Sequence, residues 1–293
     1  MPELQKQTVQ WFPGHMAKTR RLIKESLPAV DCVTELLDAR VPLSSRNPEL
    51  DELTRQKPRI VLLNKCDMAD AQTTALWIDW FRKQGKAALA VDCRSGKGLN
   101  RFQSTVQTVL ADKIRANAER GMPGKALRVM VVGIPNTGKS SFINRMAGKS
   151  RAKVADRPGV TRSNQWFAIG GGIELLDTPG VLWPKFDDPV VGDRLAFIGS
   201  VKDEVLDGET MACRLLDVLC RDYPNLLCER YKLTEGELSK AADSYDVLML
   251  IGKKRGMLIR GGEVNTERAA AALLDEYRGG KLGRLSFEKP DTD

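Results

Sequence analysis

The sequence predicts an α/β protein in which a mostly parallel sheet, with helices on both faces, is followed by an all-helical C-terminal domain. Several short apolar runs are continuous rather than alternating, as in strands that are buried on both faces. Segments compatible with helices lie between them, and strand, helix, strand repeated along a chain is typical of a parallel sheet. After Pro189 the apolar runs give way to helical periodicity.

The expected strands are six apolar runs, at residues 32–38, 59–64, 87–92, 127–132, 164–169 and 173–177. Helices are expected between several of these strands, at 70–84, 98–119 and 139–147. The stretch 116–128 is interpreted as a connector within the first domain.

The C-terminal part carries the helical signals. One helical face is formed by Ala212, Leu215, Leu216 and Leu219. Residues 265–280 predict a further helix, with Asn265 as its N-cap and glycines at its end. We therefore predict a first domain at 1–188 and a helical domain at 189–293.

The composition excludes some classes of protein. Hydrophobic residues make up 42% of the 293 residues and charged residues 29%, which is ordinary for a globular chain. No apolar run reaches the roughly 18 residues of a membrane span, and the N-terminus lacks the apolar stretch of a secretory signal. We therefore expect a cytoplasmic protein without a membrane partner. Six cysteines without a CxxC pair, and a single histidine, argue against a structural zinc site.

The chain is basic, with a net charge of +8 and a pI of about 9.2. Such a balance favours an anionic partner: nucleic acid, nucleotide or membrane surface. The alternative is an ordinary solvated basic surface, and charge alone does not decide between the two.

The stretch GIPNTGKSS (133–141) fits the phosphate-binding pattern GxxxxGK[ST]. It follows the expected strand LRVMVV and precedes an expected helix, a context that a chance glycine-rich turn would lack. Backbone N–H groups would surround the β-phosphate, Lys139 would reach the β- and γ-phosphates, and the Ser140 hydroxyl would ligate Mg²⁺. The residues predicted to bind nucleotide in this loop are Asn136, Thr137, Gly138, Lys139, Ser140 and Ser141.

The stretch NKCD (64–67) ends another buried strand, at the edge where loops of a parallel sheet bind ligands. The Asp67 carboxylate would accept both N1–H and N2–H of guanine, donors that adenine lacks. Asn64 would brace the loop, and the stem of Lys65 would lie along the base. Together with the phosphate loop, this motif indicates a GTPase that binds GTP and GDP.

Three further stretches complete the predicted site. In DTPG (177–180), Asp177 would hold Mg²⁺ through water and the Gly180 N–H would contact the γ-phosphate. Thr161, in RPGVTR, would supply a second hydroxyl ligand to Mg²⁺, although a plain turn is an equal interpretation. Cys93 lies in DCRSGKG (92–98), which would support the base, with Asp92 and Cys93 where small residues are usual.

The order of these motifs is permuted, because the guanine motif precedes the phosphate loop, the reverse of Ras-like GTPases. A site assembled from loops at one sheet edge permits this order. The order, together with WFPGHMAKTRR, DARVPLSSRNP and the terminal GRLSFE, resembles the YlqF-type family of circularly permuted ribosome biogenesis GTPases. The resemblance covers nearly the whole chain. It implies a bacterial cytoplasmic enzyme that hydrolyses GTP during late assembly of the large ribosomal subunit, and a helical tail that contacts ribosomal RNA.

Two positions depart from Ras-type chemistry. Val181 follows DTPG, where Ras-type enzymes place a glutamine that orients water. We therefore expect His15, the only histidine, to act in catalysis, the alternative being a structural or RNA-contacting role. Asn136 stands where many GTPases have glycine. It either helps to bind K⁺, as the resemblance to related permuted enzymes implies, or simply accepts the local backbone geometry.

The partners expected are the large-subunit precursor and its ribosomal RNA, bound by a monomer. The stretch GKKRG (252–256) offers Lys253, Lys254 and Arg255 for phosphate contact, and a solvated loop is the alternative. A competing function is a GTP-gated RNA-binding module in which hydrolysis is incidental. A third hypothesis is a GTPase that acts on a membrane or on tRNA. The lack of an anchor or modification domain argues against it.

Overall fold

The computed structural model describes residues 14–148, 165–201 and 207–291, with side chains from Ala17 onward. Thr161 lies outside the described residues, as does the side chain of His15. The described chain forms two compact units. One holds the residues up to Lys185 together with Ser286 onward, and the other runs from Phe186 to Leu285. The predicted division at 188/189 falls near this boundary, but the last residues join the first unit, for reasons given below.

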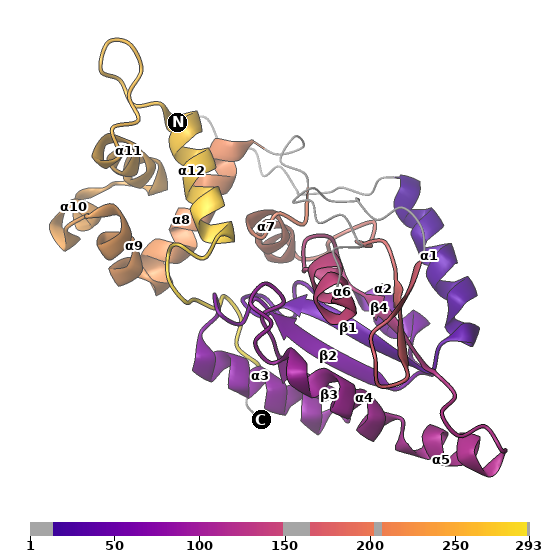
Figure 1. Cartoon of the computed structure of the whole chain (residues 1–293). Coiled ribbons are helices and arrows are strands. Elements are labelled where there is room, and N and C mark those ends of the chain that lie inside the picture. The colour runs from indigo at the N-terminus through magenta and orange to yellow at the C-terminus, as the bar shows by residue number, and fades with distance from the viewer. Residues whose placement is uncertain (1–13, 149–164, 202–206, 292–293) are drawn as a thin grey trace. The chain divides into compact units, whose positions relative to one another are not determined.

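The first unit is built on a six-stranded sheet with the order β3-β2-β1-β4-β6-β5. Figure 1 shows this sheet, with β1, β2, β3 and β4 labelled. Its strands are β1 (Cys32–Asp38), β2 (Arg59–Asn64), β3 (Ala87–Ala90), β4 (Leu127–Val132), β5 (Gln165–Ala168) and β6 (Ile173–Asp177). All neighbours pair in parallel except β5, which runs antiparallel to β6 at the edge. The prediction of a mostly parallel sheet is confirmed.

Helices cover both faces of the sheet. Successive residues of a strand point to opposite faces, and because the strands are mostly apolar throughout, both faces must be packed against helices. Leu62 packs in a core with Phe102 and Phe142, whereas Leu63 packs on the other face with Trp77. The helical segments of this unit are α1 (Gly14–Ser26), η1 (Leu27–Ala29), α2 (Pro48–Leu53), α3 (Ala71–Lys83), η2 (Leu99–Arg101), α4 (Phe102–Val109), α5 (Ala111–Glu119) and α6 (Lys139–Ala147).

One predicted helix is divided. The segment expected as a single helix over 98–119 begins as a 3₁₀ turn and is interrupted at Leu110, which is buried. Since α5 continues to Glu119, the connector is shorter than predicted and occupies only the residues before β4.

The second unit is helical, which confirms the prediction for this region. Its helices are α7 (Pro189–Phe197), α8 (Gly208–Asp222), α9 (Pro224–Tyr231), α10 (Glu235–Lys240), α11 (Ser244–Lys254) and α12 (Thr266–Arg278). The predicted apolar face of α8 is buried, and the Asn265 side chain caps α12 by accepting the Arg268 N–H at 2.8 Å. None of the helices in the described ranges is long and apolar enough to cross a membrane.

Candidate nucleotide-binding site

The four predicted site motifs each follow a parallel strand, at one edge of the sheet. The guanine motif follows β2, the loop 92–98 follows β3, the phosphate loop follows β4 and DTPG follows β6. The loop after β1, from Ala39 to Asn47, lies between them in the strand order. Ligands of open parallel sheets bind at this carboxyl edge.

The phosphate loop has the backbone of an anion cradle. Gly133, Asn136 and Gly138 all have positive φ, at 150°, 61° and 96°. A Cβ on Gly138 would lie 2.3 Å from the Asn64 amide nitrogen, so only glycine fits there. The loop runs directly into the N-terminus of α6 at Lys139, where unpaired backbone N–H groups and the helix dipole favour phosphate.

Asn64 joins three loops. Its Nδ2 donates to the Thr137 carbonyl at 2.7 Å, and its Oδ1 accepts the Cys93 N–H at 2.9 Å. The side chain is 3% exposed, so both hydrogen bonds are shielded from water. The guanine motif, the phosphate loop and the base-supporting loop therefore meet at one residue, although 73 positions separate Asn64 from Thr137.

The guanine loop presents an exposed carboxylate beside a fixed lysine. Asp67 is exposed, while Lys65 has φ 60° and its Nζ lies 3.0 Å from Asp38. Burial of Asp38 opposes its ionisation, but Arg40 and Lys65 overcome this and hold the pKa of the carboxyl well below its usual range. Asp38 therefore stays charged and fixes Lys65.

Asp92 gives the base-supporting loop its shape. Its carboxylate accepts the N–H groups of Arg94 at 2.8 Å and Ser95 at 3.2 Å, and its N–H donates to Lys97. A residue that was unexpected from the sequence thus has a structural reason, since the side chain folds the loop on itself. The Cys93 thiol is buried, and burial raises its pKa above the usual range, so the neutral thiol packs while its backbone N–H meets Asn64.

Lys139 lies folded over the phosphate loop. Its Nζ donates to the carbonyls of Gly133 at 3.0 Å and Ile134 at 2.7 Å. Burial lowers the pKa of Lys139 to about 8, and the negative charge of Asp177 partly opposes this. A poorly solvated ammonium group is suited to a polyphosphate.

Asp177, the predicted Mg²⁺ residue, lies at the end of β6 beside the phosphate loop. Asp177 is 2% exposed and pairs in register with Val131, two residues before the phosphate loop begins. Gly180 leaves no room for a side chain, because a Cβ would lie 2.8 Å from the Pro135 nitrogen and 3.1 Å from Lys139 Nζ. A buried carboxylate is a hard oxygen donor of the kind that Mg²⁺ takes beside phosphates, so the chemistry of Asp177 fits this cation.

Val181 is fully buried in an apolar cluster with Ile23, Leu50 and Met130. Its carbonyl accepts a 3.0 Å hydrogen bond from Asn47 Nδ2, whose Oδ1 caps α2 through the Glu49 N–H at 2.9 Å. Sequence reasoning missed Asn47, although DARVPLSSRNP was noted as a motif. An Asn-Pro pair before an apolar run is a helix-start signal that could have shown the cap.

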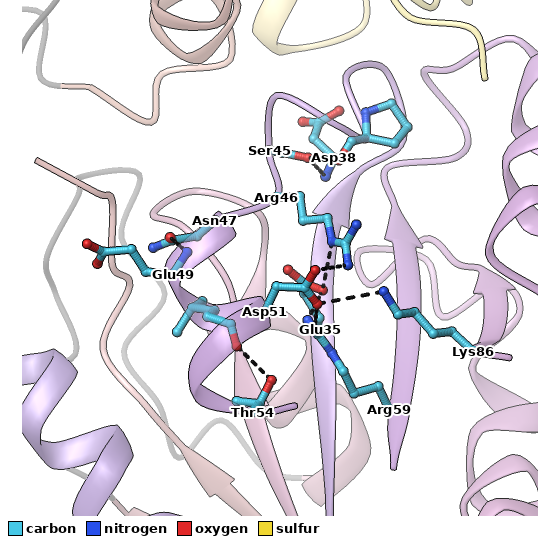
Figure 2. A network of polar contacts seen from close by, with 12 residues as sticks. Glu35, Asp38, Ser45, Arg46, Asn47, Glu49, Asp51, Thr54, Arg59 and Lys86 are labelled. Atoms are coloured by element: carbon cyan, nitrogen blue, oxygen red, sulfur yellow. Dashed lines mark hydrogen bonds and ion pairs between the residues drawn. The ribbon is translucent and has the colours of Figure 1, made fainter. Parts of the chain in front are cut away.

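An ion network holds α2 against the sheet (Figure 2). Arg59 pairs with Glu35 of β1 and with Asp51 of α2, and Arg46 lies 2.6 Å from Asp51. Lys86 adds a contact of 3.7 Å with Asp51. These ion pairs hold α2 on the sheet, and they therefore also fix the position of Asn47, the N-cap of this helix.

His15 lies in the first turn of α1. The helix is attached to the rest of the unit further along. Arg20 pairs with Glu49 at 3.2 Å, and Ile23 packs in the same cluster as Val181.

Of the basic residues at the end of α11, two have partners within the helical unit. Lys254 pairs with Glu237 at 2.8 Å. Arg255 contacts Glu276 at 3.1 Å and stacks on Tyr231. Lys253 is exposed.

Comparison with known proteins places these features in a family. The family described as 50S ribosome-binding GTPase matches residues 128–220. Ribosome biogenesis GTPase A of Priestia megaterium is 47% identical over 284 residues, covering 97% of this chain and 97% of that protein. The protein of the same name from Bacillus cereus is 45% identical over 283 residues, covering 97% and 94%.

Solved structures agree. The GDP-bound structure of TM YlqF matches with a TM-score of 0.65 and 29% identity, covering 92% of this chain and 98% of that chain. The GNP-bound structure of YlqF from T. maritima gives a TM-score of 0.64 and 28% identity, with coverage of 94% and 99%.

Proposed function

Because the chain belongs to the ribosome biogenesis GTPase A family, we propose that it binds the large ribosomal subunit precursor and hydrolyses GTP to GDP and phosphate late in that subunit's assembly. Membership confirms the family resemblance and makes the chain a GTP hydrolase of ribosome biogenesis. The family described as 50S ribosome-binding supports the choice of the large subunit. The observation that carries the proposal is the junction at Asn64, which joins the guanine and phosphate loops into one site.

Within this site we assign the following roles. Asp67 accepts the two guanine donors, with Lys65 along the base and Cys93 on its other side. The ammonium group of Lys139 moves from the loop carbonyls to the phosphates, and the Gly180 N–H donates to the γ-phosphate. Mg²⁺, when bound, neutralises phosphate charge, and the residues that would hold it are Ser140, Thr161 and, through water, Asp177.

Water activation is assigned to His15. Val181 is buried in the core and has no polar group, so a residue outside this segment must orient the attacking water. Neutral imidazole, with an unperturbed pKa near 6.5, suits that task at neutral pH. The middle of α1 is attached through Arg20 and Ile23, whereas His15 lies about 12 Å further along the helix axis from Ile23. Ribosome contact at the segment WFPGHM would bring the imidazole to the γ-phosphate.

K⁺ binding at Asn136 remains a separate proposal. The positive φ of Asn136 favours the alternative, in which asparagine is chosen for its backbone conformation. Hydrolysis measured in K⁺ against Na⁺ buffers distinguishes the two, since only a bound cation makes the rate depend on which one is present.

RNA contact is proposed for the end of α11. Lys253 is the best placed of the three basic residues because Lys254 and Arg255 already hold ion pairs. We further propose that the chain works as a monomer in the cytoplasm, which light scattering and cell fractionation test.

The decisive experiment is co-sedimentation with large-subunit precursors, in GDP and in a non-hydrolysable GTP analogue, together with turnover assays. We expect tighter binding with the analogue and stimulated hydrolysis. His15→Ala should keep GTP affinity and lose stimulated turnover by about 10²-fold or more. Lys253→Glu should weaken sedimentation, with Lys240→Glu, an exposed lysine at the end of α10, as the control. Equal binding with both nucleotides, or stimulation by the small subunit alone, would contradict the proposed function.

A further inference from the structure

The C-terminal residues Ser286, Phe287 and Glu288, here named the C-terminal strap, lie in the nucleotide-binding unit. The chain reaches them directly from the helical unit, which ends at Leu285. All three make hydrogen bonds to the loops that flank the guanine motif. The strap therefore lies beside the loops of the guanine site, although it is far from them in the sequence.

On one side the strap holds the loop after β1. The Phe287 N–H donates to the Arg40 carbonyl at 2.8 Å. The Glu288 carboxylate accepts the N–H of Leu43 at 2.6 Å, the N–H of Ser44 at 3.0 Å, and the Ser44 hydroxyl. Glu288 is only 7% exposed, so these donors compensate the cost of burying its charge.

On the other side the strap holds the start of α3. The Ser286 hydroxyl oxygen accepts the Asp70 N–H at 3.2 Å, and the Glu288 carbonyl accepts Trp77 Nε1–H at 3.1 Å. Asp70 is the N-cap of α3, and it follows Asp67 by three residues. The guanine loop thus has strap contacts on both flanks.

A buried ion pair connects the loop after β1, which the strap holds, to the guanine loop. Arg40 donates from Nε and Nη2 to the two oxygens of Asp38, at 3.0 and 2.9 Å. Lys65 Nζ lies 3.0 Å from the same carboxylate. Arg40 and Asp38 are 1% and 0% exposed, so a shift of the loop at Arg40 reaches Lys65 through a rigid contact.

We propose that Glu288 is a positioning residue for guanine recognition, acting through the loop at Arg40 and the Asp38–Lys65 pair. The inference rests on the guanine loop assigned above. It gives the terminal SFE residues a role in the affinity for the base, where family resemblance had given them none. It also means that the helical unit is joined covalently to a part that sets nucleotide affinity.

The test compares nucleotide binding by Glu288→Gln and the parent. Glutamine has nearly the same shape, but in either orientation its NH₂ group would face the backbone N–H of Leu43 or Ser44 in place of an acceptor. GDP and GTP affinities should fall by the same factor, of order three- to tenfold, because the base is common to both nucleotides. Lys289→Gln, at the exposed neighbouring position, is the matched control and should bind like the parent.

A double-mutant cycle with Lys65→Ala separates positioning from simple loss of stability. If Glu288 acts through Lys65, Glu288→Gln should lower nucleotide affinity clearly less in the Lys65→Ala background than it does in the parent. Additive effects, a loss for GTP only, or unchanged affinities at a lowered Tm would each overturn the proposal. Asp67→Asn tests the guanine loop independently. If Asp67→Asn keeps parental GDP affinity, the assignment of the guanine loop is wrong. If Asp67→Asn loses GDP affinity while Glu288→Gln binds GDP like the parent, only the proposed role of Glu288 is wrong.

Discussion

Asp67, to which we assign the choice of base, is exposed. The Asp67→Asn substitution replaces one acceptor with an amide donor. We expect the variant to lose GTP binding and to prefer xanthine nucleotide, whose C2 oxygen accepts that donor, because unmatched polar groups in a binding site are costly. Titration with GDP and XDP measures the switch. Parental GDP affinity would remove Asp67 from the site.

We expect Lys139 to make nucleotide binding depend on pH. Its pKa is lowered to about 8 by burial, with Asp177 as the opposing charge. Phosphates beside the ammonium group favour its charged form and raise the pKa again. Binding should therefore take up a proton above about pH 8, and GDP affinity should fall by up to tenfold per pH unit there.

Calorimetric titration at pH 8.5, in two buffers of different ionisation enthalpy, measures this proton uptake. The Lys139→Met variant is the control, because it has no proton to gain. A binding enthalpy of the parent that is the same in both buffers would argue against a lowered pKa at Lys139.

At the level of elements, Asn47 ties α2 to the segment after DTPG. The Asn47→Ala substitution removes the α2 cap and leaves the buried Val181 carbonyl without this donor. We expect a loss of about 2–3 kcal/mol in the unfolding free energy of the nucleotide-binding unit. GTP affinity should fall more than GDP affinity, since the neighbouring Gly180 is assigned to the γ-phosphate.

The Asn47→Ser variant is the matched control for this element, because serine caps a helix but is too short to reach Val181. Its stability should lie between those of the parent and the alanine variant, as measured by urea unfolding. If the serine variant equals the parent in both stability and preference for GTP, the hydrogen bond to Val181 contributes to neither.

For the whole molecule, the division into two units predicts how nucleotide affects unfolding. All the loops assigned to GTP and the C-terminal strap lie in one unit, and the helices from α7 to α12 lie in the other. At a GDP concentration 100-fold above Kd, the first unit should gain about 2.7 kcal/mol and the helical unit nothing. Differential scanning calorimetry should show one transition that moves with GDP and one that does not. A single transition that moves as a whole would mean that the two units unfold together.

The amino-acid sequence determined the elements and the chemistry of the site. Buried parallel strands are mostly continuous apolar runs, so the positions of β1, β2, β3, β4 and β6 could be predicted. The antiparallel edge strand β5 was predicted from its apolar residues too, although most of its side chains are exposed. The phosphate and guanine motifs could be identified because few residue types meet their needs, such as glycine at positive φ in position 138. The bracing role of Asn64 was predicted as well, since its place at the end of a strand limits what it can reach.

Only the tertiary structure decided which distant segments meet. Glu288 and Ser44 are 244 residues apart, and Asn47 and Val181 are 134 apart. No local periodicity encodes such pairs, because they follow from the strand order, which places the loops after β1 and β6 near those after β2 and β4. The ion pairs of Lys254 and Arg255 were missed for the same reason. Hydrophobic periodicity records which side of an element is buried, whereas long-range hydrogen bonds depend on what the completed fold brings against it.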